Sequence, residues 1–270
     1  MTQKTLSYER VTGGGTPSSW LLMLHGIYGA GRNWGQVARR VARRRDDWGA
    51  VLVDLRQHGD SQGFPPPHTI AAAAQDLVHL VRSSGLRAAA VLGHSFGGKV
   101  ALRYAREEPP DLEQVWVVDS IPESRAPEGS AWEMLGALRR VPHAYESRDD
   151  AIEALAGQGI ARPVAQWMVT NLEWRDGRYQ WRIDFDDMEA LLRDFFDTDL
   201  WSVVEEPPPG VAVHFVRATQ SAVMAQSVAR IRAAGERTRV TVHDVEGGHW
   251  LNADNPDALV DLLVRELPAA

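Results

Sequence analysis

Short, uninterrupted apolar runs alternate with longer segments of helical periodicity along most of the chain. Seven such runs predict buried strands, at residues 6–11, 20–25, 50–54, 88–93, 115–119, 211–217 and 239–244. Apolar residues that recur every three or four positions predict helices between them, at 34–45, 69–84, 98–107, 224–234 and 256–267. This alternation predicts an α/β fold, with a mostly parallel central sheet that carries helices on both faces.

The alternation stops between residues 123 and 204. This stretch contains no convincing buried strand, and its apolar residues return at helical spacing, as in Trp132, Met134, Leu135 and Leu138. Three consecutive prolines at 207–209 close it. We therefore expect a core domain made of residues 1–122 and 205–270, interrupted by a helical cap (lid) insertion at 123–204.

Composition and charge remove several functional classes. The 270 residues are 44% apolar and 24% charged, which is typical of a globular protein, and the formal net charge of −7 argues against nucleic-acid binding. The chain has no cysteine, so disulfide scaffolds, thiolate metal sites and a cysteine nucleophile are excluded. The sequence shows neither a signal peptide nor a run long enough to span a membrane, so we expect a cytoplasmic protein without a membrane partner.

One pentapeptide carries a nucleophile signature. Gly93-His94-Ser95-Phe96-Gly97 fits the pattern G-x-S-x-G, between an apolar run that predicts a strand and a segment that predicts a helix. Small residues allow a sharp turn here that holds the serine above the sheet edge. We interpret Ser95 as a catalytic nucleophile. His94 adjoins it but should point elsewhere, in a supporting position.

A serine nucleophile requires a base and a carboxylate. His249 follows two glycines after the last predicted strand, where hydrolases with this motif carry their base. The usual place for the acid, after residues 211–217, holds no carboxylate. We therefore assign the acid to Asp119, at the end of the preceding strand, while Asp244, Asp199 or no acid at all remain alternatives. Ser221 is a candidate for a supporting hydrogen bond to the histidine or the acid.

The oxyanion of a tetrahedral intermediate needs backbone N–H donors. Phe96, directly after the nucleophile, is predicted to supply one. The loop His25-Gly26-Ile27-Tyr28-Gly29 follows an early strand, and its glycines allow close approach to substrate. We assign the second donor to Ile27, with His25 and Tyr28 as supporting residues.

These features together resemble the α/β-hydrolase superfamily over nearly the whole chain. Three segments are similar to a group of small acyl esterases and thioesterases that includes the YbfF-type esterases and the abhydrolase-11 proteins: residues 97–101, 118–122, and 170–174 with Trp181-Arg182. The resemblance implies an α/β-hydrolase fold with a helical cap over a Ser-His-Asp triad, no cofactor, and acyl esters or acyl-CoA thioesters as substrates. Asp184 stands where the resemblance leads us to expect asparagine.

The expected activity is therefore that of a carboxylesterase-type serine hydrolase, which cleaves ester or thioester bonds of small acyl substrates through an acyl-enzyme. Tryptophans of the cap and the histidine loop, Trp132, Trp167, Trp174 and Trp250, are candidates for an apolar acyl pocket. We find no metal-ligand spacing and no phosphate-binding loop, and expect a monomer or small homo-oligomer. The alternatives are a carbon–carbon bond hydrolase, other cofactor-free chemistry on the same scaffold, and a non-catalytic ligand-binding protein.

Overall fold

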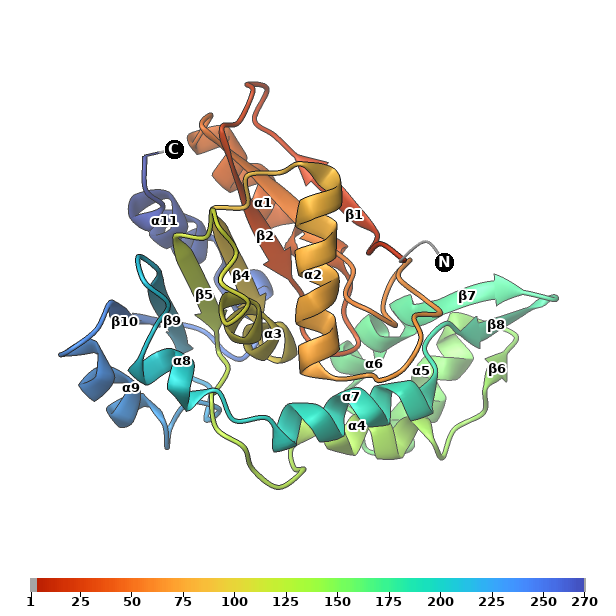
Figure 1. Cartoon of the computed structure of the whole chain (residues 1–270). Helices are drawn as coiled ribbons and strands as arrows, with labels where there is room; N and C mark the ends of the chain where they lie inside the picture. The colour runs from red at the N-terminus through yellow and green to blue at the C-terminus, as the bar shows by residue number, and fades with distance from the viewer. Residues whose placement is uncertain (1–3, 270) are drawn as a thin grey trace.

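The computed structural model describes residues 4–269, and a seven-stranded sheet forms the centre of that part of the chain (Figure 1). Its order is β1-β3-β2-β4-β5-β9-β10, and β1 alone among these strands runs antiparallel to its neighbour. This confirms the predicted mostly parallel sheet. The strands are β1 (Tyr8–Val11), β2 (Ser19–Leu24), β3 (Trp48–Val53), β4 (Ala90–His94), β5 (Gln114–Val118), β9 (Ala212–Ala218) and β10 (Val240–Val245).

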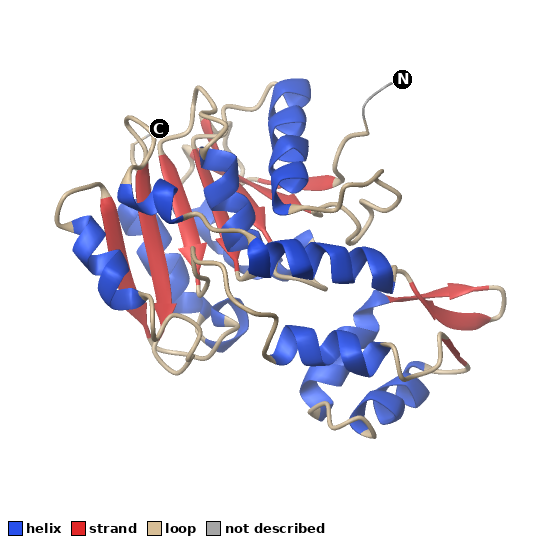
Figure 2. Ribbon diagram, turned by 60° about the horizontal axis from the view of Figure 1, so that its bottom comes forward, coloured by secondary structure: helices blue, strands red, loops and turns tan. Residues whose placement is uncertain are grey.

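Helices cover both faces of the sheet, as Figure 2 shows. Helices α1 (Gly35–Arg44) and α11 (Pro256–Glu266) pack on one face, where they enclose one hydrophobic core. On the other face, α2 (Ile70–Ser84), α3 (Phe96–Ala105) and α9 (Val228–Gly235) share a second core with the insertion. The cores explain why β2, β3, β4 and β5 are apolar on both sides.

The predicted helices begin and end close to the observed ones. Thr69 caps α2 by accepting a hydrogen bond from the backbone N–H of Ala72 (3.0 Å), and Gly85 ends that helix with a φ of 64°. Helix α9 begins at Val228 rather than at residue 224, because the preceding residues form turns. The short helices η1 (Gly31–Trp34) and α10 (Leu251–Asp254) complete the core.

The insertion is not wholly helical, which corrects the sequence prediction. Strands β6 (Ala144–Tyr145), β7 (Leu172–Arg175) and β8 (Arg178–Trp181) form a small antiparallel sheet, and the β7–β8 hairpin projects from the molecule (Figure 1). Asp176 and Gly177 turn this hairpin with positive φ values of 51° and 78°. The helices of this region are α4 (Ser130–Leu138), α5 (Arg148–Ala156), α6 (Arg162–Met168), η2 (Val169–Asn171), α7 (Phe185–Asp197) and α8 (Trp201–Glu205).

Helix α8 lies within the range assigned to the insertion but packs against α3 and α9 of the core. The remaining elements, α4 to α7, lie beside one end of the sheet, as Figure 2 shows, and this region is called the cap below. Asp184 caps α7, because its Oδ1 accepts hydrogen bonds from the N–H groups of Asp186 (2.9 Å) and Asp187 (3.1 Å). Aspartate and asparagine serve equally well at such a position, so the departure from the expected asparagine preserves the helix start.

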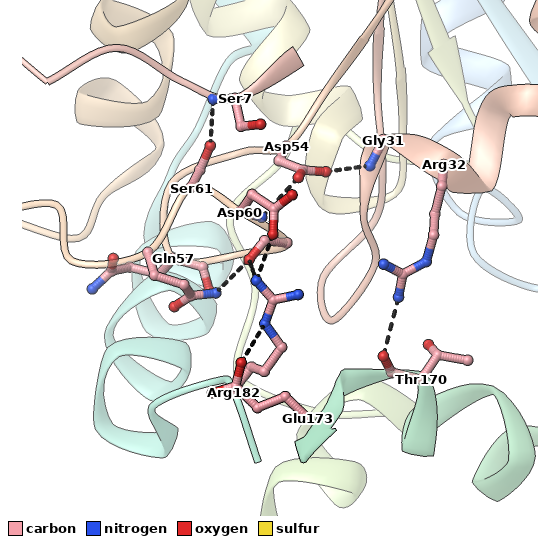
Figure 3. Close-up of polar contacts among 12 residues, drawn as sticks. Ser7, Gly31, Arg32, Asp54, Gln57, Asp60, Ser61, Thr170, Glu173 and Arg182 are labelled. Atoms are coloured by element: carbon pink, nitrogen blue, oxygen red, sulfur yellow. Dashed lines mark hydrogen bonds and ion pairs between the residues drawn. The ribbon is translucent and has the colours of Figure 1, made fainter. Parts of the chain in front are cut away.

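Polar contacts join the cap to loops at this end of the sheet (Figure 3). Arg32 donates to the Thr170 carbonyl (3.2 Å), and Arg182 contacts the carboxylate of Asp60 (2.6 Å). Asp54 holds the core side in place, since its two oxygens accept from the N–H groups of Gly31 (2.7 Å) and Asp60 (2.8 Å). The cap is therefore fixed to the loops that follow β2 and β3.

Within residues 4–269, no helix combines the length and apolar character needed to cross a membrane.

Candidate active site

The turn between β4 and α3 places Ser95 in a strained conformation. Ser95 has φ 51° and ψ −113°, in a region that L residues rarely adopt. The turn requires glycine on both sides: a Cβ on Gly93 would lie 1.9 Å from the Gly97 carbonyl oxygen, and one on Gly97 would lie 2.6 Å from the His25 oxygen. The sequence therefore forms a sharp elbow that presents Ser95 at the wall of a cavity.

Asp119 follows β5 and lies fully buried. Its φ of 43° is also positive, and its N–H donates to the Val216 carbonyl (2.8 Å) on the neighbouring strand β9. This bond turns the side chain toward the loop after β10, where the Asp119 Oδ2 lies 2.7 Å from the His249 Nδ1. The structure thus brings together the carboxylate and the histidine that the sequence paired across 130 residues.

His94 forms a hydrogen bond with the loop that carries His249. Its Nε2 donates to the backbone carbonyl of His249 (2.8 Å), and the two rings lie 4.5 Å apart. Burial holds the pKa of His94 well below its usual value, so the ring stays neutral and keeps its single N–H for this bond. His94 therefore fixes the backbone of the residue that pairs with Asp119, and it lines the same cavity as Ser95.

The other candidate carboxylates have different partners. Asp244 pairs with Arg217 and Arg232, and Asp199 accepts a hydrogen bond from the N–H of Trp201 (3.1 Å). Ser221 accepts from the N–H of Val223 (3.3 Å) and stabilises its own turn, rather than bonding to the histidine or the acid. Asp119 also accepts a hydrogen bond from the N–H of Ala218 (3.4 Å).

The loop after β2 approaches the elbow closely. Gly29 donates to the Gly26 carbonyl (3.0 Å), which closes a turn whose third residue, Tyr28, has a φ of 62°. A Cβ on Gly26 would lie 3.0 Å from the Nδ1 of His94 and 3.6 Å from the Cβ of Ser95, so the loop backbone lies close to the elbow. Ile27 lies in the turn, and the N–H of Phe96 belongs to the first turn of α3, where helix N–H groups lack intrahelical acceptors.

His25 and Tyr28 hold this loop from two sides. The His25 Nδ1 donates to the Gly26 carbonyl (2.7 Å), while its Nε2 accepts from the N–H of Leu55 (3.0 Å). Burial lowers the pKa of His25 to about 4, so the neutral form makes both bonds at pH 7. The Tyr28 hydroxyl donates to the Ala131 carbonyl (3.0 Å) at the start of α4 in the cap. Both residues act on loop geometry.

A cavity of about 360 Å³ lies between these loops and the cap. Ser95 and His249 line it, as do Ile27 and Tyr28 of the loop. Its cap wall is mostly apolar, with Ala131, Met134, Pro163, Val164 and Trp167 beside the polar Ser130. A predominantly apolar wall around a few polar groups is typical of a small-molecule site.

Two of the four candidate tryptophans line this cavity. Trp167 and Trp250 do so, with ring centroids 6.3 Å apart. Trp132 instead meets Phe196 edge-on (6.1 Å), and Trp174 is 61% exposed on strand β7. Trp174 is exposed because it lies on the projecting hairpin, a segment that the sequence predicted to be helical.

Polar residues gather at another side of the cavity. Asn33, Asn252 and the exposed carboxylate of Asp254 line it there, and the Asn252 amide donates to the Asn33 carbonyl (3.1 Å). Among the described residues that line the cavity, none is lysine or arginine. Residues 4–269 also contain no cluster of three or more metal-ligating side chains suited to a metal ion.

In a comparison of the whole sequence, the profile described as "Alpha/beta hydrolase family" matches residues 21–262. The chain belongs to the alpha/beta hydrolase family. The predicted α/β-hydrolase fold is thereby confirmed.

The chain is also similar to several proteins named lipases or esterases. It is 28% identical to the sn-1-specific diacylglycerol lipase ABHD11 of Mus musculus, with 97% of this chain and 85% of that protein covered. It is 27% identical to the lipase LipV of Mycobacterium tuberculosis, with 92% of each covered. A solved marine microorganism esterase shares the fold, with a TM-score of 0.84, 22% identity, and 97% and 99% coverage. The predicted resemblance to abhydrolase-11 proteins is confirmed.

Asn171 is a buried residue of this alpha/beta hydrolase whose contact sequence reasoning did not foresee. Its side-chain amide donates to the carbonyl of Tyr28 (2.9 Å), so the cap reaches the loop beside Ser95. Residues 170–174 resemble a segment of other proteins, but no sequence pattern predicts which group a buried asparagine will contact. The contact joins residues 143 positions apart.

Proposed function

We propose that this chain is a serine esterase that cleaves uncharged carboxylic esters with an apolar acyl group. The proposal rests on the strained Ser95, which lines a cavity together with His249. The Nδ1 of His249 lies 2.7 Å from the carboxylate of the buried Asp119. The relatives named lipases and esterases bear out the prediction of a carboxylesterase-type hydrolase. The geometry supports a Ser-His-Asp triad as its mechanism.

In this mechanism, the His249 Nε2 removes the proton from the Ser95 hydroxyl as the oxygen attacks the acyl carbon. Asp119 fixes the tautomer, because its carboxylate accepts the Nδ1–H and leaves Nε2 free to act as base. The imidazolium that forms is stabilised by the same carboxylate. It then protonates the leaving alkoxide, and the acyl group stays on Ser95 as an ester.

The backbone supports the charge that develops on the acyl oxygen. We assign the N–H groups of Ile27 and Phe96 as its donors, one from the Gly26–Gly29 turn and one from the start of α3. The positive end of the α3 dipole lies at the same place. Water activated by His249 then attacks the acyl-enzyme, which releases the acid and restores the Ser95 hydroxyl.

The cavity favours an uncharged substrate. Its mostly apolar cap wall suits an acyl chain, and its lining holds the carboxylate of Asp254 without a described lysine or arginine. An acyl-CoA thioester carries several phosphate charges, which would meet no cation here and would be repelled by Asp254. We therefore propose neutral esters, rather than acyl-CoA thioesters, as the substrate class.

Replacement of Ser95 tests this function directly. In Ser95→Ala, hydrolysis of p-nitrophenyl butyrate should fall by about a thousandfold or more, because the covalent route is lost. Labelling by a fluorophosphonate, followed by mass spectrometry of the intact protein, should disappear in the same variant. Ser221→Ala, which removes a serine outside the cavity, should keep both signals. Undiminished activity of Ser95→Ala would refute the mechanism, and a wild type that neither labels nor hydrolyses esters would indicate a ligand-binding protein.

A further inference from the structure

Lys99 is a fully buried lysine in the first turns of α3, four residues after Ser95. Its ammonium donates to three backbone carbonyls, those of Glu123 (2.7 Å), Phe195 (2.6 Å) and Thr198 (2.8 Å). An ammonium has three N–H bonds, so every donor is used. Such complete pairing is what a buried cation requires.

The three acceptors lie where the chain crosses between core and cap. Glu123 is at the start of the insertion, and its carbonyl belongs to the segment that leaves β5. Phe195 and Thr198 are at the carboxyl end of α7, where the chain returns. Carbonyls at the end of a helix lack intrahelical donors and carry the negative end of the dipole, so a cation is favoured there. One side-chain atom therefore contacts both crossings.

The surroundings keep the ammonium charged at neutral pH. Burial lowers the pKa of Lys99 to about 8, while the charges of Glu123, Asp199 and Asp194 favour the protonated form and Arg125 opposes it. The ammonium also lies 4.6 Å from the centroid of the Phe195 ring. That ring lies 6.0 Å from the ring of Phe96, the residue after the nucleophile.

We propose that Lys99 is a positioning residue that fixes both crossings of the cap to the helix carrying Ser95, and so sets the width of the acyl cavity. The cap supplies the wall of that cavity through Ala131, Met134, Val164 and Trp167, whereas Ser95 and His249 belong to the core. Loosening the crossings would displace the wall and leave the reacting groups in place. The effect on substrates rests on the proposed esterase function; the effect on the crossings does not.

The test compares two substitutions that each remove a cation bound to carbonyls. Lys99→Met keeps the length of the side chain and removes the three bonds. Arg148→Met removes a guanidinium that donates to Val169 (2.6 Å) and Leu172 (3.0 Å), both inside the cap, and serves as the matched control. Amide hydrogen exchange of residues 122–127 and 195–200 is followed by mass spectrometry, together with kcat and KM for p-nitrophenyl acetate and hexanoate.

In Lys99→Met we expect exchange at both crossings to accelerate at least about tenfold, with β2 to β4 unchanged. KM for the hexanoate should rise about tenfold, while kcat/KM for the acetate should change less than about threefold. Arg148→Met should leave the crossings unaltered. Unchanged exchange at the crossings in Lys99→Met, or equal loss on both esters, would overturn the proposal. If wild type hydrolyses neither ester, the esterase function fails, and the exchange data still decide whether Lys99 holds the crossings.

A second variant covers the case in which Lys99→Met fails to fold. Lys99→Arg keeps the charge, but the planar guanidinium cannot direct N–H groups at three carbonyls arranged for an ammonium. We expect the rate of amide hydrogen exchange at the crossings to lie between the wild-type rate and a rate about tenfold higher. Wild-type exchange and wild-type hexanoate KM in Lys99→Arg would show that the charge alone suffices, and would overturn the assignment of a three-bond contact.

Discussion

The core and the cap hold their shape by different means. In the core, parallel strands exchange backbone hydrogen bonds and bury apolar side chains on both faces. The cap instead consists of short helices and a small sheet. It shares a hydrophobic core with α2, α3 and α9, and individual polar side chains such as Lys99, Asn171 and Arg182 add contacts across the boundary. The candidate reacting groups come from the core, and the cap supplies one mostly apolar wall of the cavity. Under the proposed function, we expect the core to govern rate and the cap to govern substrate choice.

Asp119→Asn should give the largest effect and tests the core side of this contrast. An amide cannot accept the Nδ1–H in the same geometry and would favour the wrong histidine tautomer, so kcat should fall by about a thousandfold. Because the defect is chemical, acetate and hexanoate esters should lose rate equally. Asp244→Asn, which removes a carboxylate already paired with two arginines, should keep kcat within about twofold. A near-normal rate in Asp119→Asn would assign the acid elsewhere.

Acid should weaken the core through a histidine pair far from the cap. His214 on β9 and His243 on β10 share a hydrogen bond (3.0 Å), and His214 stacks on Trp116 at 4.1 Å. Burial lowers the pKa of His214 to about 4 and also lowers that of His243. The folded state therefore resists protonation that the unfolded chain accepts near pH 6.5. This contribution to stability is complete above pH 6.5 and is lost as the pH falls toward 4.

We expect the free energy of unfolding to fall by about 2 kcal/mol from this source between pH 7 and pH 4.5, measured by urea denaturation. His214→Phe keeps a ring on Trp116 but cannot titrate, so its stability should depend less on pH over the same interval. An identical pH dependence in wild type and His214→Phe would exclude the pair as its source.

Asn171→Ala tests an exception to the division between core and cap. Asn171 belongs to the cap, but it contacts the loop beside Ser95. Loss of the bond to the Tyr28 carbonyl should let the Gly26–Gly29 turn move, and kcat should fall about tenfold on short and long esters alike. Thr170→Ala is the matched control, since the Thr170 hydroxyl bonds only within the cap, to Trp167 (2.7 Å). A change confined to long esters in Asn171→Ala would restrict the cap to substrate choice.

Asp254→Asn should give the smallest effect, and it concerns a core residue that acts on substrate choice. Removal of the exposed carboxylate should raise kcat/KM about threefold for a nitrophenyl ester that carries a carboxylate, with neutral esters unchanged. The gain should shrink in high salt. Asp257→Asn, on α11 and paired with Arg40, is the control with the same charge change. Equal behaviour of the two variants would rule out a local role for Asp254.

The difference between the regions also explains what the sequence could predict. Strand β4, the elbow and α3 follow one another within 16 residues, so a local pattern specified Ser95 and its surroundings. The β7–β8 hairpin was missed, although Asp176-Gly177 between the alternating Leu172, Trp174, Tyr179 and Trp181 is a strong hairpin signal. The bonds of Lys99 reach carbonyls 24 to 99 residues away, and backbone carbonyls carry no sequence signature.

The positive φ values of Ser95 and Asp119 have a consequence for how this protein can change over evolution. Glycine would adopt the backbone conformation at each position without strain. Serine and aspartate there each cost about 1–3 kcal/mol of backbone strain. Under the proposed mechanism, both residues are kept for activity at a cost in stability. Stabilising substitutions that keep the proposed activity should therefore come from positions outside the elbow and the end of β5.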